Sequence, residues 1–303
     1  MTKPLKPVKA SMMNAIHDLP LLVARDEGFF RDQGLAVEII TTPGSGQRDS
    51  DHQALRANVF DRTMEALYDQ GACDQFRMCE WGVMKRAVES NVTSGHRPAK
   101  IVALGSAMST FAIVTDPKSR IYEPEQLKDK PIGVSPYNGS HFTTLKLLEG
   151  FLKREQIKTT FAGTMKERLE AVSRGEVAAV SLMEPWISVA EKRGLRVLME
   201  SHSTRSEAAG DELDGATLRK MFDAESEAAK AIEKDPGKYA HYLVEEAGGL
   251  LELKDLKLAR ILNAPPEAYT RERFQHTYDW TRDWGLVPAG ATYENTVDNR
   301  AWQ

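Results

Sequence analysis

Two thiols, two carboxylates, an arginine and two aromatic rings lie close together in the stretch Gly71-Ala-Cys-Asp-Gln-Phe-Arg-Met-Cys-Glu-Trp81. A neighbouring imidazole lowers the pKa of a thiol, and the resulting thiolate is a strong nucleophile. Cys79 or Cys73, with His17 or His52 as the base, is therefore a candidate nucleophile for a lyase or hydrolase. The alternative is that both cysteines are small residues of a core or cleft wall. Their C-x5-C spacing fits no standard zinc or redox motif.

A second stretch, Ser135-Pro-Tyr-Asn-Gly-Ser-His-Phe142, leads into an expected helix. Backbone N–H groups at the start of a helix suit an anion, and a glycine lets the backbone come close to it. We therefore predict a site for a sulfonate, carboxylate or phosphate, with Ser140 as the helix N-cap. Its residues are Ser135, Asn138, Gly139, Ser140 and His141. The alternative is an ordinary serine-capped helix without a ligand.

Further candidate ligand contacts come from other loops. Asn14 and His17 follow the first expected strand, Gln75 lies in the cysteine-containing stretch, and Glu184 and Trp186 open a later helix. Trp186 could stack on an aromatic ligand or pack in the core, and His17 could face the ligand or solvent. The chain has no GxGxxG, P-loop, HExxH or serine-hydrolase motif, so we expect no cofactor and no bound metal.

The elements that must position these residues follow from the hydrophobic pattern. Apolar residues at helical spacing in 19–30 indicate a short helix, and Gly28 and Gly34 are expected to end helical turns. Alternation over 35–40 indicates a strand, with another at 8–13 before the helix. The order strand, helix, strand recurs over 131–182. Residues 81–88 are expected to form a helix with apolar side chains facing inward, and residues 101–104, 111–115 and 195–198 are expected to form separate strands. Residues from 216 onward read as almost wholly helical, with breaks at 235–237, 248–249 and 265–266. This alternation predicts an α/β fold of mostly parallel sheets flanked by helices.

In such folds ligands bind at the carboxyl ends of the strands. The loops expected there are Asn14–Leu19, Thr41–Gln47, Ala72–Trp81, Ser106–Thr110 and Ser135–Phe142, joined by Glu184–Trp186. We expect two lobes around a hinged cleft, with residues 1–106 and 204–303 in the first and 107–203 in the second. The hinge segments would lie near 104–111 and 198–215.

Composition narrows the class of protein. A chain of 303 residues with 41% hydrophobic residues suits two lobes of moderate size. Its net charge of −4 speaks against a dedicated nucleic-acid binder. No apolar run is long enough to cross a membrane, and no secretory signal is seen. We expect a cytosolic protein, or a periplasmic one if the N-terminus is a processed form.

Several motifs in order resemble the nitrate/sulfonate (SsuA-like) group of type II periplasmic-binding-protein folds, the substrate-binding proteins of ABC transporters. They are Pro20–Phe30 with Gly34–Glu38, Glu123–Ser135, Ala171–Val180 with Glu184–Trp186, and Gly285–Pro288 with Tyr293 and Val297. The chain departs from the family pattern in lacking a signal peptide and in carrying Ala178 and Ala179 where an Asp is usual. Residues 47–64 also look longer and more polar.

The resemblance implies binding of a small organic or anionic solute in the cleft between the lobes, with a transporter permease as a candidate partner. The alternative is a cofactor-independent enzyme on the same fold, such as a desulfinase, decarboxylase or hydrolase, acting on a small anionic substrate, aromatic or aliphatic. The family includes an aryl sulfinate desulfinase whose nucleophilic Cys lies in the loop after the first strand. This chain has His17 there, so that nucleophile is not carried over. The Cys-rich iron motif of the related pyrimidine synthases is also missing, and a regulatory role is the weakest option because no DNA-binding helix-turn-helix is evident.

Overall fold

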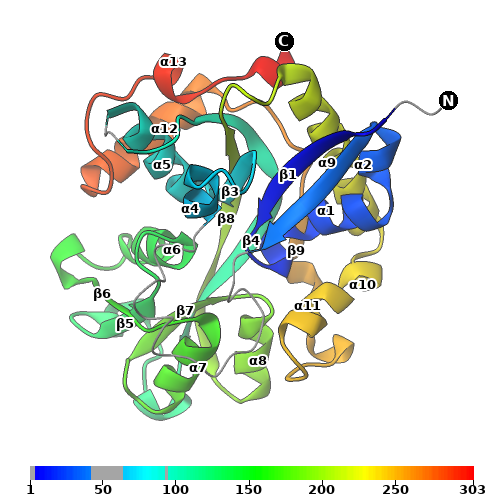
Figure 1. The fold of residues 1–303 in the computed structure, drawn as a ribbon. Coiled ribbons are helices and arrows are strands. Elements are labelled where there is room, and N and C mark those ends of the chain that lie inside the picture. The colour runs from blue at the N-terminus through cyan, green and yellow to red at the C-terminus, as the bar shows by residue number, and fades with distance from the viewer. Residues whose placement is uncertain (1–3, 42–63, 93–94) are drawn as a thin grey trace. The chain divides into compact units, whose positions relative to one another are not determined.

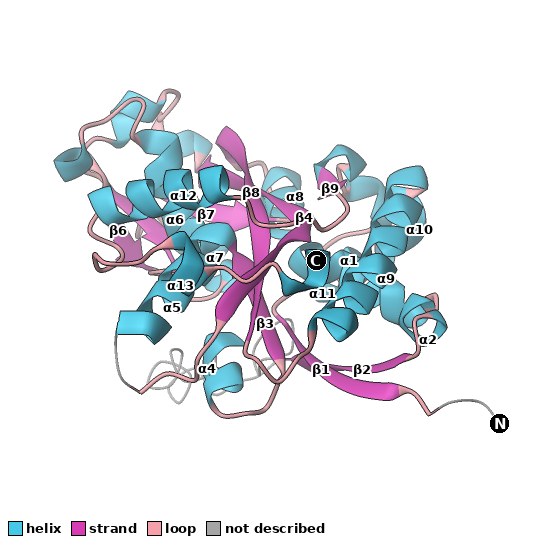
Figure 2. Ribbon diagram, turned by 90° about the horizontal axis from the view of Figure 1, so that it is seen from above, coloured by secondary structure: helices cyan, strands magenta, loops and turns pink. Residues whose placement is uncertain are grey.

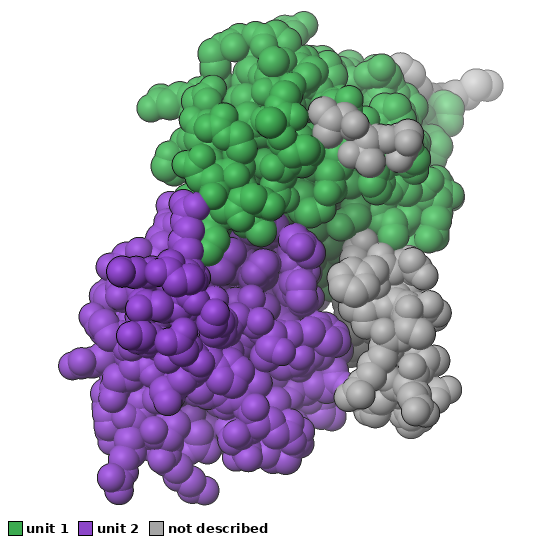
Figure 3. Space-filling model, turned by 90° about the vertical axis from the view of Figure 1, so that its left-hand side faces the viewer, with its two compact units in different colours: residues 1–107, 204–239, 263–303 green, residues 108–203, 240–262 purple. Residues whose placement is uncertain are grey.

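The computed structural model describes residues 4–41, 64–92 and 95–303. The chain forms two compact units, coloured separately in Figure 3. Unit 1 comprises residues 1–107, 204–239 and 263–303, and unit 2 comprises residues 108–203 and 240–262. Most of the predicted loop Thr41–Gln47, and His52, lie outside the described residues.

Unit 1 contains a sheet with the strand order β2-β1-β3-β8-β4 (Figures 1 and 2). β1 is parallel to β2 and β3, and β3 is antiparallel to β8. The strands are β1 Lys6–Met12, β2 Leu35–Thr41, β3 Gln75–Cys79 and parts of β4 Lys100–Thr115 and β8 Arg196–Ala209. The helices are α1 Ala15–Asp26, α2 Phe29–Asp32, α4 Met64–Asp69, α5 Glu80–Val92, α9 Gly215–Lys234, α10 Pro236–Tyr239, α12 Arg271–Asp283 and α13 Tyr293–Thr296, with a 3₁₀ turn at Arg300–Trp302.

Unit 2 contains a sheet with the order β4-β7-β5-β6, in which β5 is parallel to both neighbours and β4 is antiparallel to β7. Its own strands are β5 Pro131–Val134, β6 Lys158–Phe161 and β7 Ala179–Met183, and the short β9 Ile261–Asn263 pairs with β4 where the two units' residue ranges meet. Its helices are α6 Gly139–Leu148, α7 Met165–Ser173, α8 Trp186–Lys192 and α11 His241–Glu246, with 3₁₀ turns at Pro117–Ser119, Pro124–Leu127, Arg154–Gln156, Leu253–Asp255 and Leu258–Arg260. The units are linked through β4 and β8, whose residues fall partly in each.

Local sequence signals explain the element ends. Asn14 caps α1, and Gly28 and Gly34 adopt φ of 85° and 76°, which confirms the predicted turn positions. The predicted helix in residues 81–88 is confirmed within α5, and its expected inward residues are fully buried. The two predicted strand-helix-strand repeats are also present.

Three predictions of local structure were wrong. Residues 101–104 and 111–115 belong to one strand, β4, because the intervening Gly-Ser-rich segment, including the predicted loop Ser106–Thr110, also pairs within the sheet. β8 likewise continues from 196 to 209. Residues 250–264, between the expected breaks at 248–249 and 265–266, contain 3₁₀ turns and β9 instead of helix.

The predicted division into lobes and the observed units differ in one segment. The chain changes unit after residues 107 and 203, but residues 240–262 group with unit 2, whereas the sequence suggested the first lobe. Ion pairs fix this segment to α8, from Lys192 to Asp255 at 2.6 Å and from Lys257 to Glu191 at 2.5 Å. Ion pairs leave no hydrophobic periodicity in the sequence. The sequence pattern therefore could not show that residues 240–262 belong to unit 2.

Candidate functional site

The side chains of β3 alternate between two environments, as expected for a strand buried on both faces. Phe76 and Met78 belong to the apolar core of unit 1. Arg77 and Cys79 point to the opposite face, where register places Glu207 and Arg205 of β8 beside them. The result is a fully enclosed layer of charged side chains on one face of the sheet.

This charged layer consists of Asp18, Arg77, Arg205, Glu207 and Glu225, none more than 2% exposed. Arg77 donates to Glu207 at 2.8 Å and also to Glu225, which in turn accepts from the Ser106 hydroxyl at 2.8 Å. Asp18 accepts from the backbone of Met13 at 2.7 Å and pairs with Arg205 at 2.6 Å. The layer thus joins α1, β3, β8 and α9 by charge.

Burial shapes the protonation of this layer. It raises the pKa of Glu207 to about 8, although the Arg77 guanidinium opposes the shift. Burial also raises the pKa of Asp18 against the effect of Arg205. For Arg77 the carboxylates of Glu207 and Glu225 outweigh burial and raise the pKa, so it stays charged. Glu207 is therefore mostly protonated at neutral pH.

A second buried carboxylate, Glu80, follows directly after β3. It accepts from the hydroxyls of Tyr269 at 2.6 Å and Thr277 at 2.7 Å, and from Arg273 Nε at 2.8 Å. Burial works to raise its pKa, but the Arg273 hydrogen bond and the hydroxyl donors lower it overall. These hydrogen bonds engage the carboxylate of Glu80 and hold α12 and Tyr269 against the end of β3. The role of Glu80 is therefore structural.

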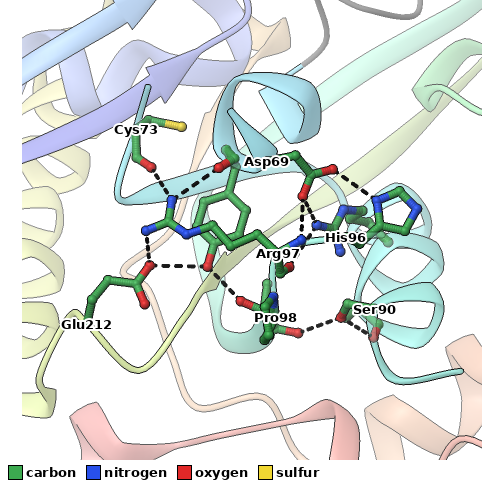
Figure 4. A network of polar contacts seen from close by, with 11 residues as sticks. Asp69, Cys73, Ser90, His96, Arg97, Pro98 and Glu212 are labelled. Atoms are coloured by element: carbon green, nitrogen blue, oxygen red, sulfur yellow. Dashed lines mark hydrogen bonds and ion pairs between the residues drawn. The ribbon is translucent and has the colours of Figure 1, made fainter. Parts of the chain in front are cut away.

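A third network surrounds Arg97, shown in Figure 4. The Arg97 guanidinium donates to the carbonyl oxygens of Tyr68 at 3.1 Å and Cys73 at 2.9 Å, and it also pairs with Glu212. The backbone N–H of Arg97 donates to Asp69 at 2.9 Å. These bonds fasten the segment before β4 to the end of α4. They use the carbonyl of Cys73, not its thiol.

The structure gives the predicted residues of unit 1 different environments. The Asn14 side chain accepts from the His17 backbone N–H at 3.0 Å, as an N-cap does. His17 is 2% exposed, and burial together with Arg205 lowers its pKa well below the usual value, so its ring is neutral. Gln75 is fully buried, and among the described residues neither end of its amide has a hydrogen-bond partner. A buried amide in this state keeps its donors and its acceptor available to a water or a ligand.

Both cysteines are free thiols with at most 1% exposure. Burial raises the pKa of Cys73 and of Cys79 to about 12. Neither is a thiolate at neutral pH, which is what a cysteine nucleophile requires. In this conformation they have the environment of core residues.

In unit 2 the loop after β5 is held by its own side chains. Asn138, not Ser140, caps α6, and its side chain accepts from the Gly139 N–H at 2.5 Å. The Ser140 hydroxyl instead accepts from the Ser135 N–H at 3.0 Å. His141 Nδ1 accepts from the Tyr137 N–H at 3.2 Å, and burial lowers the pKa of its ring. The predicted N-cap, Ser140, was therefore wrong, because α6 begins at Gly139, before the first apolar residue of the helix.

Glu184 and Trp186 flank a cis peptide bond before Pro185. Glu184 accepts from the Ser188 hydroxyl and from Arg260 Nη1, both at 3.0 Å, and burial raises its pKa. Trp186 is 9% exposed. Both side chains are committed to packing around α8, so their proposed role in ligand binding would need rearrangement of these contacts.

The residues of the charged layer were not predicted as a site from the sequence. Arg77 was seen only as part of the cysteine-rich stretch, and Arg205 and Glu207 fell in a segment assigned to a hinge. A signal existed, since Arg77 lies two residues from Gln75 and Glu207 two residues from Arg205, which is the period of one strand face. Among the described residues, no group of three or more His, Cys, Asp or Glu is arranged to hold a metal ion.

Comparison with known proteins places the fold. No protein-family model and no curated protein sequence matches the chain. The alkanesulfonate-binding protein SsuA of Xanthomonas axonopodis pv. citri, bound to MOPS, aligns over 95% of this chain and 96% of its own, with TM-score 0.69 and 15% identity. The nitrate-binding protein NrtA of Synechocystis PCC 6803 covers 98% of this chain and 87% of its own, with TM-score 0.74 and 13% identity. The desulfurization enzyme DSZB aligns over 98% of this chain and 97% of its own, with TM-score 0.61 and 13% identity.

The chain has the periplasmic-binding-protein fold of the SsuA-like proteins. This confirms the predicted α/β periplasmic-binding-protein fold class. The sheet is mixed rather than mostly parallel, because β8 is antiparallel to β3 and β4 is antiparallel to β7. The same periplasmic-binding-protein fold carries binding proteins and an enzyme, so it does not by itself decide between the two functions. Within the described ranges, no helix is both long and apolar enough to cross a membrane.

Proposed function

We propose that this protein binds a small anionic solute of the sulfonate or carboxylate class. The observation that carries the proposal is its likeness, over nearly the whole chain, to proteins that bind two different anions, an alkanesulfonate and nitrate. Those proteins share the fold with this chain but little of its sequence. The class of solute is therefore inferred from the chemistry of the residues at the site.

The anion is proposed to bind at the loop after β5, at the N-terminus of α6. The Ser140 hydroxyl accepts from Ser135 and keeps its own proton to donate to a ligand. The positive end of the α6 dipole adds to the attraction. In unit 1, Asn14, His17 and Gln75 stay predicted ligand contacts, and the buried amide of Gln75, which has no hydrogen-bond partner among the described residues, is the best supported of the three.

The proposed partner is a transporter permease, as expected for a solute-binding component. Escherichia coli SsuA and Synechocystis NrtA are both described as periplasmic. We expected a cytosolic protein from the sequence. A periplasmic solute-binding component and a cytosolic relative of one both agree with the proposed binding.

Thermal unfolding and calorimetric titration with MOPS, methanesulfonate, acetate and nitrate test the proposal. A solute at 100 times its dissociation constant adds about 2.7 kcal/mol to the free energy of unfolding, which raises the melting temperature by several degrees. Ser140→Ala should reduce this rise, whereas Ser173→Ala, at the far end of α7 in the same unit, should not. If no anion shifts the melting temperature of the wild type, solute binding of this class is excluded.

The alternative function, a cofactor-independent enzyme with a Cys nucleophile and a His base, has less support. DSZB shows that the fold can carry a desulfurization enzyme. The raised pKa of both thiols and their burial argue against a nucleophile here. Rapid alkylation of Cys79 by iodoacetamide in the native protein at neutral pH would restore this alternative.

A further inference from the structure

Arg168, on α7 of unit 2, is 4% exposed and differs from the other buried arginines. Arg77, Arg86, Arg205 and Arg260 each pair with at least one carboxylate. Arg168 has no ion pair with any described residue within 4 Å. Its hydrogen bonds go to two neutral groups, the carbonyl oxygens of Gly163 at 3.2 Å and Ser181 at 2.7 Å. An enclosed guanidinium without an opposite charge is costly unless something supplies one.

The charge of this side chain persists at neutral pH. Burial lowers the pKa of Arg168 to about 10, and Glu167 opposes the shift only as the lesser influence. The Glu167 carboxylate is engaged elsewhere, since it accepts from the Thr164 backbone N–H at 2.7 Å. Unit 2 therefore holds a permanent buried cation that its own described carboxylates do not neutralise.

Strand register locates this cation. The last paired residues of β5 and β7 are Gly133 and Val180, and Ser181 follows immediately. The last paired residues of β5 and β6 are Val134 and Phe161, and Gly163 lies two residues later. The guanidinium therefore bonds β7 at Ser181 and the segment just after β6 at Gly163, at the level where β5 ends. There the chain leaves the sheet as Ser135 and enters the loop to α6.

Donor capacity remains on the guanidinium. Nε donates to Gly163 and Nη1 to Ser181, while Nη2 makes no hydrogen bond with a described residue. The N–H groups of Nη2 are therefore not used by the described part of the chain, and they remain available to an acceptor that the chain does not supply. A guanidinium edge is suited to a carboxylate or sulfonate because two N–H groups can bind two oxygens.

We propose that Arg168 is the anion-binding residue of unit 2, with its guanidinium facing the carboxyl end of β5 and neutralising the acidic group of a bound sulfonate or carboxylate. The inference rests on the proposed function and specifies it. The loop residues Ser135 and Ser140 orient the anion by hydrogen bonds, and Arg168 supplies the charge that distinguishes it from an uncharged isostere.

Methanesulfonate is the probe, with uncharged methanesulfonamide as its isostere. Thermal unfolding is followed over increasing concentrations of each, at constant ionic strength. The wild type should show a saturable rise in melting temperature with methanesulfonate only. Arg168→Met should require an at least about tenfold higher concentration for the same rise, because a hydrogen bond to a charged group contributes more than a neutral one.

Arg174→Met is the matched control. Arg174 lies at the end of the same helix, is exposed and pairs with Glu176 at 2.6 Å, so its loss should leave the methanesulfonate response unchanged. A structural role for Arg168 would lower the melting temperature without ligand in the variant but would not alter the difference between sulfonate and sulfonamide. The proposal is overturned if Arg168→Met responds like the wild type, or if the wild type shows no saturable response.

A second measurement applies if Arg168→Met does not fold. The Arg168 Nε–H resonance, identified by its absence in Arg168→Lys, should shift saturably with methanesulfonate in the wild type, and an unmoved resonance refutes the proposal. The two proposals can fail separately. If the solute still binds after loss of Arg168, solute binding stands as the function and the role of Arg168 is refuted. If methanesulfonate binds at Arg168 but the larger solutes cause no response, the Arg168 site is not the site of the proposed solute binding.

Discussion

Glu207 is enclosed beside Arg77, yet its pKa is about 8 because burial outweighs the nearby positive charge. The unfolded chain would hold this carboxyl near its ordinary value of 4.5. The folded protein therefore binds a proton more tightly than the unfolded one between these values. The contribution is fully present below pH 4.5 and is lost as the pH rises through 8.

We predict that the free energy of unfolding of the wild type falls by about 3 kcal/mol more than that of Glu207→Gln between pH 6 and pH 9. The glutamine keeps the shape and the neutral state but cannot release a proton. Urea unfolding at each pH measures the difference. Glu38→Gln, which changes an exposed side chain on β2, is the control and should follow the wild type. Equal slopes for wild type and Glu207→Gln would mean that Glu207 is ionised in the folded protein.

Residue types predicted the candidate site only in part. The two thiols stood out by composition, but their burial removes the reactivity that made them notable. Arg168 carried no sequence signal, because its meaning depends on which carboxylates lie near it in space. Gln75 was predicted as a ligand contact, and its amide has no hydrogen-bond partner within the described ranges, although the sequence offered no reason beyond its place beside the cysteines.

At the scale of elements, β5 sets the position of the proposed anion site, and Gly133 lets it fit between its neighbours. A Cβ at this glycine would lie 2.8 Å from the Ala162 Cβ and 3.0 Å from Val180 Cγ1. Both contacts are to the segments on either side of β5. The sheet therefore closes around this position with no space for a methyl group.

Gly133→Ala should lower the free energy of unfolding by about 1–3 kcal/mol, since overpacking forces neighbouring atoms apart. The midpoint of urea unfolding reports this change. Gly150→Ala is the matched control in the same unit, because nothing lies within 4 Å of its added Cβ. If both variants unfold at the same midpoint, β5 is not packed as tightly as the distances indicate.

Element types were more predictable than element lengths. Glycines with positive φ ended helical turns where expected, since few other residues adopt that conformation. The lengths of β4 and β8 were underestimated. Their polar middle sections, such as 105–110, are stabilised by partner strands far away in the sequence. Pairing between distant strands is a tertiary property that local pattern does not contain.

At the scale of the whole molecule, the order of strands and helices along the chain was predictable. The unit to which residues 240–262 belong was not. The alternation of strands and helices gave the α/β architecture that the structural relatives share. Residues 240–262 joined unit 2 instead of the first lobe. Arg260, 5% exposed, is central to that assignment because it bonds Glu184 at 3.0 Å and Glu191 at 2.7 Å and also pairs with Glu200.

Arg260→Met should therefore act on unit 2 and spare unit 1. Removing one partner of a buried ion pair leaves Glu184 enclosed without its cation, which typically costs about 3–5 kcal/mol. Hydrogen exchange should become faster in α8 and in residues 253–262, while β1 and β2 of unit 1 keep their protection. Lys254→Met, which removes an exposed pair with Glu252, should change neither set. Equal loss of protection in β1 and β2 would show that residues 240–262 stabilise unit 1 as much as unit 2, and the boundary drawn from sequence would then be the better one.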